Sequence, residues 1–184
     1  MRALSDGNGD GWECAAAAAG AQQHTFREQV LTLRVSEEVV VSAYPQLGPR
    51  EMAAAAGAIV RVAVRSRDTF LSPDGATMLT DYRATVSEVK DAAGRLAAGD
   101  VITIRRVGGV MLIEGRRVFS NEAGFPRFAD SAQYVLFLKG GGQPFELVAG
   151  AESAFRVEGD LVAPVAEGTA PVLMPAFVQD VRRK

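Results

Sequence analysis

The sequence predicts a mainly β protein whose antiparallel strands form one sandwich or barrel. Three observations support this prediction. Short apolar runs recur from Ala58 onward with turn residues between them, as in all-β domains. Several of these runs alternate apolar and polar residues, which is the period of a strand with one buried face. A chain of 184 residues, 48% of them hydrophobic, is long enough for one domain with a hydrophobic core.

The first two strands are predicted to form a long antiparallel hairpin. The runs AIVRVAVRSR (58–67) and TMLTDYRATVSEV (77–89) both alternate with a period of two. Between them SPDG (72–75) is typical of a turn, because Pro73 presets φ and Gly75 tolerates a positive φ. The residues expected on the buried faces are Val60, Val62, Val64, Thr80, Tyr82, Ala84 and Val86.

Further strands are predicted at short intervals. Gly108 and Gly109 separate the next two runs, and Gly115 can turn the second run back on itself. The run at 132–139 is apolar on both faces, so we expect it at the centre of the sheet. The segments are DVITIRRV (100–107), GVMLIEGRRVF (109–119), AQYVLFLK (132–139), PFELVAG (144–150) and SAFRVEGDLVAPV (153–165), the last a hairpin about Gly159–Asp160.

Two helices are predicted beside the strands. PREMAAAAGA (49–58) has a proline near a first turn, a run of helix-forming alanines and a glycine near its end. MPAFVQDVRRK (174–184) places Phe177, Val178 and Val181 on one side and basic residues at its C-terminal end. Residues 29–47 fit either a pair of strands or a single lead-in strand.

The N-terminal segment contains an incomplete calcium-loop pattern. Asp6, Asn8, Asp10 and Gly11 match the first half of an EF-hand loop, but the position of the closing carboxylate falls on Ala17. Without that bidentate ligand the pattern is interpreted as a solvated Gly/Asp segment. We therefore assign no metal-binding residue.

A pattern of small residues follows at Ala19–Gly20–Ala21, before Gln22, and this is how secretory signal peptides end. Two interpretations stay open: the tail of a signal peptide, or a disordered cytoplasmic extension. The first predicts a periplasmic or secreted protein, and the second a cytoplasmic one. Cys14 lies before the cleavage point, so a processed chain would carry no thiol. No apolar run is long enough for a membrane-spanning helix.

Enzyme motifs are missing from the sequence. The single histidine, His24, lies in the N-terminal segment, and there is no G-x-S-x-G elbow or zinc-type ligand spacing. Scattered carboxylates are interpreted as solvated turn residues, although partners in catalysis need only be close in space. They are Glu88, Asp91, Glu146, Glu152 and Asp160. We predict a protein that is not an enzyme, with no catalytic residue and no cofactor.

Nucleic-acid binding is disfavoured by composition. The chain carries 20 basic and 22 acidic residues, and only 7% of its residues are aromatic, whereas single-strand binders combine a basic groove with stacking platforms. Phe137, Phe145 and Phe155 stand at positions expected in the core. The arginines that could form a basic face, interpreted here as a solvated strand face, are Arg61, Arg65, Arg67, Arg105, Arg106, Arg116 and Arg117.

The order of these segments resembles a family of uncharacterised exported bacterial proteins. The resemblance rests on REMAAAAGAIVRVAVRSR, DYRATVSEV, GDVITIRRVGG, YVLFLKGGGQPFELVAG and GAESAFRVEGDLVAPV, and it covers Pro49 to Val165. More distantly, the chain is similar to netrin-like domains, which are OB-type five-stranded barrels that include metalloprotease inhibitors. The chain departs from that pattern at KDAAGRLAAGD (90–100) and lacks the N-terminal cysteine with which those inhibitors chelate zinc.

The sequence and the resemblance together predict a small OB/netrin-like antiparallel β-barrel with one short flanking helix and a C-terminal helix. We expect an N-terminal segment over residues 1–28, a β-barrel domain over 29–168 and a tail with a short helix over 169–184. The predicted function is a non-catalytic exported binding or interaction module for an unknown ligand or protein partner. The alternatives are a regulator of an extracellular hydrolase such as a metalloprotease and, third, an enzyme whose site is assembled across loops.

Overall fold

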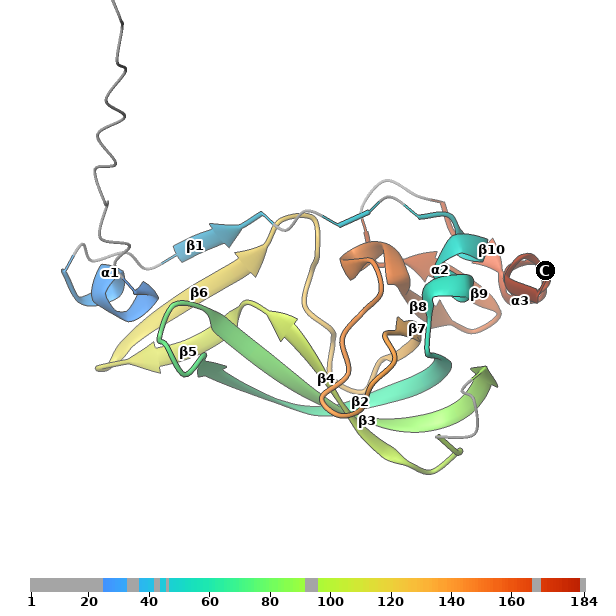
Figure 1. The fold of residues 1–184 in the computed structure, drawn as a ribbon, viewed down its shortest axis with the longest axis horizontal. Coiled ribbons are helices and arrows are strands. Elements are labelled where there is room, and N and C mark those ends of the chain that lie inside the picture. The colour runs from blue at the N-terminus through green and yellow to red at the C-terminus, as the bar shows by residue number, and fades with distance from the viewer. Residues whose placement is uncertain are drawn as a thin grey trace, which may run out of the picture.

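The computed structural model describes residues 25–32, 37–41, 44–45, 47–91, 96–166 and 170–182. This part of the chain is mainly β, as predicted (Figure 1). The calcium-like loop, the small-residue pattern at 19–21, Cys14 and His24 all lie outside the described residues. Among the described helices none has the length and apolar character that crossing a membrane requires.

Two sheets organise the described strands. A seven-stranded sheet has the order β10-β9-β8-β7-β2-β3-β4, and all its neighbours are antiparallel. A three-stranded sheet has the order β1-β6-β5, in which β1 runs parallel to β6. The strands are β1 (Glu37–Val40), β2 (Ala58–Leu71), β3 (Met78–Asp91), β4 (Val101–Val107), β5 (Gly109–Ile113), β6 (Arg116–Glu122), β7 (Gln133–Leu138), β8 (Ala154–Glu158), β9 (Leu161–Pro164) and β10 (Val172–Leu173).

The predicted long hairpin is confirmed as β2 and β3. The two strands pair from Ile59 opposite Asp91 to Leu71 opposite Met78, with register shifts at Ile59/Val60, Arg61/Val62 and Val64/Ser66. All the residues expected on the inner faces are buried, because the period of two brings each of them to the same side of the sheet. The turn after β2 is closed by a hydrogen bond of 2.7 Å from the Gly75 amide to the Ser72 carbonyl.

The strand β7 occupies the centre of the core, as its apolar sequence predicted. Leu136 and Leu138 contribute to a cluster enclosed by β2, β3 and β4. Val135 and Phe137 point the other way, into a second cluster with β8, β9 and the helices α2 (Pro49–Ala55) and α3 (Met174–Arg182). Both faces of β7 are therefore covered by hydrophobic side chains. A polar residue on either face would replace a buried apolar contact.

The predicted strand at 144–150 is only partly present. Phe145 makes a parallel bridge to Ile104 of β4, and Leu147 makes an antiparallel bridge to Leu138 of β7. Backbone hydrogen bonds of 2.8 Å join Phe145 to Thr103 and Arg105, so the short segment is held by its neighbours. The chain then turns, because Gly150 has a φ of 53° and begins the 3-10 helix η1 (Gly150–Ser153).

Both predicted helices are confirmed, as α2 (Pro49–Ala55) and α3 (Met174–Arg182). Phe177 of α3 is buried against Phe155, with ring centroids 4.7 Å apart. An ion pair of 3.8 Å between Arg50 and Asp180 links the two helices. They lie together at one end of the molecule, beside β9 and β10 (Figure 1).

A third helix, α1 (Phe26–Thr32), was not predicted. It extends into the segment from residue 29 onward, for which the sequence predicted one or two strands. Its signal is a capping box: the Thr25 amide donates to Glu28 Oε2 at 2.8 Å, and the Glu28 amide donates to Thr25 Oγ1 at 3.2 Å. Phe26 and Val30 are one helical turn apart and are buried in a third cluster with β5, β6 and the start of β3. This helix covers the opposite end of the molecule from α3 (Figure 1).

Replacing Gly109 with alanine should destabilise the fold. Gly109 has a φ of 153°, and a Cβ atom there would overlap Thr69 and Thr80 of the β2–β3 hairpin. We expect the free energy of unfolding to fall by roughly 1–3 kcal/mol in a denaturant titration, because the packed strands would have to separate. Gly142→Ala is the matched control, since Gly142 has a φ of 159° with open space around it. Equal losses in the two variants would contradict the overlap.

Candidate functional site

The described part of the chain contains a buried ion pair between β4 and β6, formed by Arg106 and Glu122. The alternation that puts Ile102 and Ile104 into the core continues to Arg106, so its side chain also points inward. Glu122, the last residue of β6, points inward for the same reason after Val118 and Ser120. The two side chains are only 4% and 3% exposed, and Arg106 Nη2 lies 3.7 Å from Glu122 Oε2.

The guanidinium of Arg106 is held by the loop that follows β6. Its Nη1 donates to the carbonyl of Pro126 at 2.9 Å, and its Nη2 donates to the carbonyl of Phe125 at 3.0 Å. The rings of Phe125 and Phe128 lie 3.1 and 4.9 Å from its carbon Cζ. Burial lowers the pKa of Arg106 to about 10, against the opposing effects of Tyr82 and Glu122. Arg106 is therefore still protonated near neutral pH.

Two polar atoms of this pair have no hydrogen-bond partner among the described residues. They are Arg106 Nε, which is a donor, and Glu122 Oε1, which is an acceptor. Leaving a buried polar atom without a partner costs roughly 1–3 kcal/mol, and more for charged groups. Such atoms in a folded protein call for a water molecule, an ion or a ligand as the missing partner.

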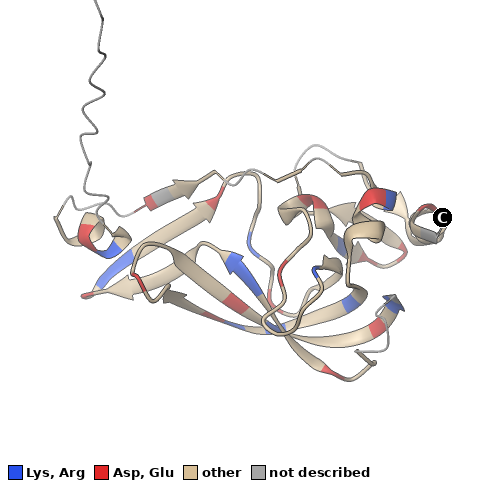
Figure 2. Cartoon of the chain, viewed as in Figure 1, with Lys and Arg blue, Asp and Glu red and all other residues tan. Residues whose placement is uncertain are grey.

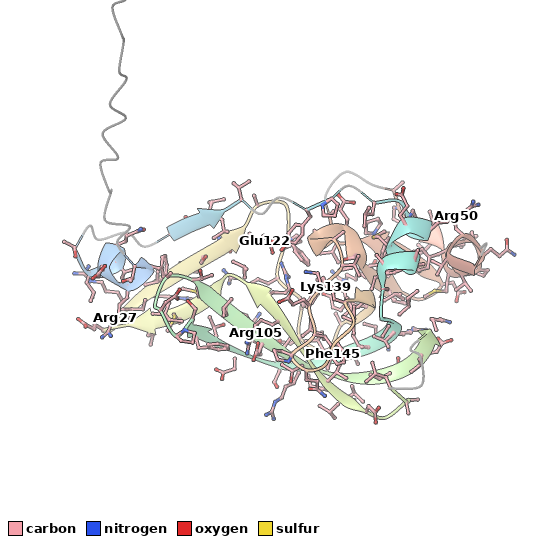
Figure 3. All side chains as sticks on the ribbon, viewed as in Figure 1. Arg27, Arg50, Arg105, Glu122, Lys139 and Phe145 are labelled. Atoms are coloured by element: carbon pink, nitrogen blue, oxygen red, sulfur yellow. The ribbon has the colours of Figure 1, made fainter. Side chains whose placement is uncertain are left out.

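A cleft of about 280 Å³ opens beside the pair. Apolar side chains form much of its wall, and Lys139 and Glu146 stand among its polar lining residues. Figure 3 shows Glu122, Lys139 and Arg105 in the middle of the molecule, between the two ends that carry α1 and α3. The apolar lining residues are Leu79, Val107, Phe125 and Leu147.

The other charged residues that line the cleft have ionic partners, either in the lining or next to it. Lys139 Nζ lies 2.9 Å from Glu146 Oε2, and both side chains are about half exposed. Arg105 makes a two-point contact with Asp81, with distances of 2.7 and 2.8 Å. The hydrogen bonds that Arg105 donates to Asp81 raise the pKa of Arg105. The charges of the lining residues are therefore largely neutralised by their partners. The atoms without a hydrogen-bond partner belong to the buried pair Arg106 and Glu122.

On one side of the cleft the backbone at Gly150 lies close to the ring of Tyr44. Gly150 and Tyr44 both line it, and a side chain at Gly150 would overlap the Tyr44 ring. The φ of 53° at Gly150 adds a second reason for glycine at this position. Tyr44 thus rests directly on the backbone at the start of η1 and brings an aromatic surface to the cleft.

The carboxylates singled out in the sequence are dispersed in the structure. Glu88 of β3 pairs with Lys90, and Glu146 pairs with Lys139. Glu152 is exposed in η1, and Asp160 is exposed in the turn between β8 and β9. Asp91 ends β3. Among the residues that the structure describes, no group of three or more histidine, cysteine, aspartate or glutamate side chains could hold a metal ion.

Most of the arginines considered as a basic face are also separated, although Arg67 and Arg117 line one pocket. Arg61 donates to Gln133, Arg65 to Thr85, and Arg67 lies 3.7 Å from Asp130. Figure 2 shows basic and acidic positions interspersed along the strands. The placement of Arg106 on a solvated face was wrong, because the inward alternation of β4 carries it into the core.

Glu122 is the functional candidate that the sequence analysis missed. The alternation of β6 could have placed it inward, but no local pattern identifies Arg106 as its partner on another strand. Comparison of the chain with protein-family models and with curated proteins finds no match. The cleft is therefore interpreted from its own geometry.

Proposed function

We propose that this chain is a non-catalytic binding module and that the cleft beside Arg106 and Glu122 takes a small polar ligand. One observation carries the proposal: a buried donor and a buried acceptor, Arg106 Nε and Glu122 Oε1, belong to residues that line one cleft and have no partner among the described residues. A ligand that satisfied both atoms would recover the cost of burying them.

The chemistry of the lining favours a neutral ligand with hydroxyl groups. A hydroxyl donates one hydrogen bond and accepts others, so adjacent hydroxyls can serve Glu122 Oε1 and Arg106 Nε together. The lining charges are already paired, so a charged ligand would find no unmatched counter-charge there. A cleft of about 280 Å³ is near the lower limit of ligand pockets, which suits a compound of monosaccharide size.

We further propose that the fold is an OB-type barrel related to netrin-like domains. Support comes from the segment 145–147, which bridges in parallel to β4 and antiparallel to β7. Because β2 pairs with both β3 and β7, and β3 pairs with β4, this segment bridges the first and last strands of the run β7-β2-β3-β4. Export to the periplasm or the medium is part of the same proposal, and its support is the small-residue pattern at 19–21.

A ligand titration followed by NMR tests the binding proposal. We expect monosaccharides or small polyols to shift the amide signals of residues around the cleft, and charged amino acids to shift them less. Glu122→Gln should weaken binding by about tenfold or more, because the carboxylate acceptor is lost. The matched control is Glu88→Gln, which removes a carboxylate paired with Lys90 and outside the cleft lining.

A second variant keeps this test decisive if Glu122→Gln folds poorly. Leu79→Trp adds bulk to the wall of the cleft without touching the ion pair, and it should abolish the shifts. Leu161→Trp, at an exposed position on β9, should leave them unchanged. The proposal fails if no compound of this class shifts cleft signals, or if the bound compound is unaffected by Leu79→Trp.

A further inference from the structure

A second, smaller pocket lies between the β2–β3 hairpin and the β5–β6 hairpin. It has a volume of about 190 Å³ and shares no described lining residue with the cleft beside Glu122. Arg67 of β2, Arg117 of β6 and Arg127 of the connection after β6 all contribute to its lining. Strand β2 and the distant segment from Arg117 to Arg127 therefore bring guanidinium groups to one pocket.

Positive charge is concentrated in this pocket. Its described lining contains the three arginines and no acidic residue. Arg67 has a partner in Asp130 at 3.7 Å, but both side chains are about half exposed, and such surface pairs are weak. Arg117 and Arg127 both lie near the ring of Phe119, at 5.1 and 5.8 Å. Like charges gathered this way repel one another unless an anion lies between them.

Neutral oxygen atoms orient Arg127 without cancelling its charge. Its Nη2 donates to Asn121 Oδ1 at 2.8 Å and contacts the carbonyl of Gly109 at 3.3 Å. These contacts use one nitrogen of the guanidinium and leave other N–H groups for a ligand. Electrostatic effects of Arg67 and Arg127 reach Tyr82 at the wall of the pocket, where they oppose the burial that raises its pKa.

The threonine hydroxyls of the lining are already committed as donors. Thr80 Oγ1 donates to the carbonyl of Gly108 at 2.6 Å. Thr69 Oγ1 lies 2.9 Å from Thr80 Oγ1, and it must be the donor of that pair because the Thr80 hydrogen is in use. The guanidinium groups are thus the main donors that a ligand meets, and guanidinium groups match the oxygens of phosphate or sulfate.

We propose that this pocket binds an oxyanion, a phosphate or sulfate group. Its volume is below the range of sites that enclose a whole small molecule, so it suits a free ion or one charged group of a larger compound. This inference concerns a separate site from the cleft, and it does not depend on the ligand proposed there.

Titration with inorganic phosphate, inorganic sulfate and glycerol phosphate at low ionic strength tests this site. We expect saturable shifts in the NMR signals of residues around Arg117 and Arg127. Arg127→Gln and Arg117→Gln should each weaken binding by about tenfold, because one charged hydrogen-bond donor is removed. Arg117 is exposed, so its replacement keeps the test valid if Arg127→Gln is unstable. Arg156→Gln is the matched control, since Arg156 pairs with Glu158 on β8.

The outcomes separate the sources of the oxyanion. Tighter binding of glycerol phosphate than of phosphate would support a group on a larger compound, and the reverse would support the free ion. Equal weakening by Arg156→Gln would mean that the anions respond only to overall charge, which overturns the proposal. Absence of saturable binding for all three anions overturns it as well.

Discussion

Replacing Glu122 with leucine should lower the free energy of unfolding by about 3–5 kcal/mol, because Arg106 would remain buried without its ionic partner. Both side chains are almost wholly buried. The guanidinium is protonated near neutral pH, so it would keep its charge after Glu122 is removed. Urea titration monitored by circular dichroism measures the loss. Lys139→Met is the control: it breaks an exposed ion pair with Glu146 and should cost less than about 1 kcal/mol.

The double variant Arg106→Met with Glu122→Leu should recover much of that loss. Replacing both members of a buried pair with apolar residues is often neutral, whereas removing one member leaves an uncompensated charge. Recovery will be incomplete, because the carbonyls of Phe125 and Pro126 lose their donors. A double variant that is less stable than Glu122→Leu alone would contradict this account of the pair.

Replacing Phe128 with alanine should cost about 3–5 kcal/mol, the range for removing a fully buried aromatic side chain. Phe128 is inaccessible to solvent, and its ring centroid lies 5.0 Å from that of Tyr82 and 4.6 Å from that of Tyr134. The loss would leave a cavity in the core and remove one of the rings that contact Arg106. Thermal and urea unfolding measure the change.

Phe70→Ala is the matched comparison for Phe128→Ala. Phe70 is a half-buried residue of β2 that lies 5.1 Å from the Arg105 guanidinium. Its removal should cost less than about half as much, because less apolar area leaves water when Phe70 folds. Similar losses for the two variants would contradict the expectation that the cost follows the apolar area each ring buries.

Strands with a strict pattern were predictable from local residues. The hairpin of β2 and β3 and the central strand β7 follow from alternation or continuous apolar character, which reflect backbone geometry over a few residues. The helix α1 was missed although Thr25 and Glu28 form a capping box, because the helix has only seven residues and its periodicity is short. The segment 144–150 has strand-like residues, but the turn and the 3-10 helix at Gly150 interrupt it.

The candidate sites were less predictable, because each one joins residues from separate elements. By itself the sequence determined that β4 alternates, since alternation is a property of the strand alone, but we interpreted Arg106 as solvated although this alternation carries it inward after Ile102 and Ile104. Only the tertiary structure placed Glu122 of the other sheet against Arg106, and Arg117 and Arg127 beside Arg67. Those neighbours depend on how the two sheets pack, and packing is decided by burial summed over the whole core rather than by any local pattern.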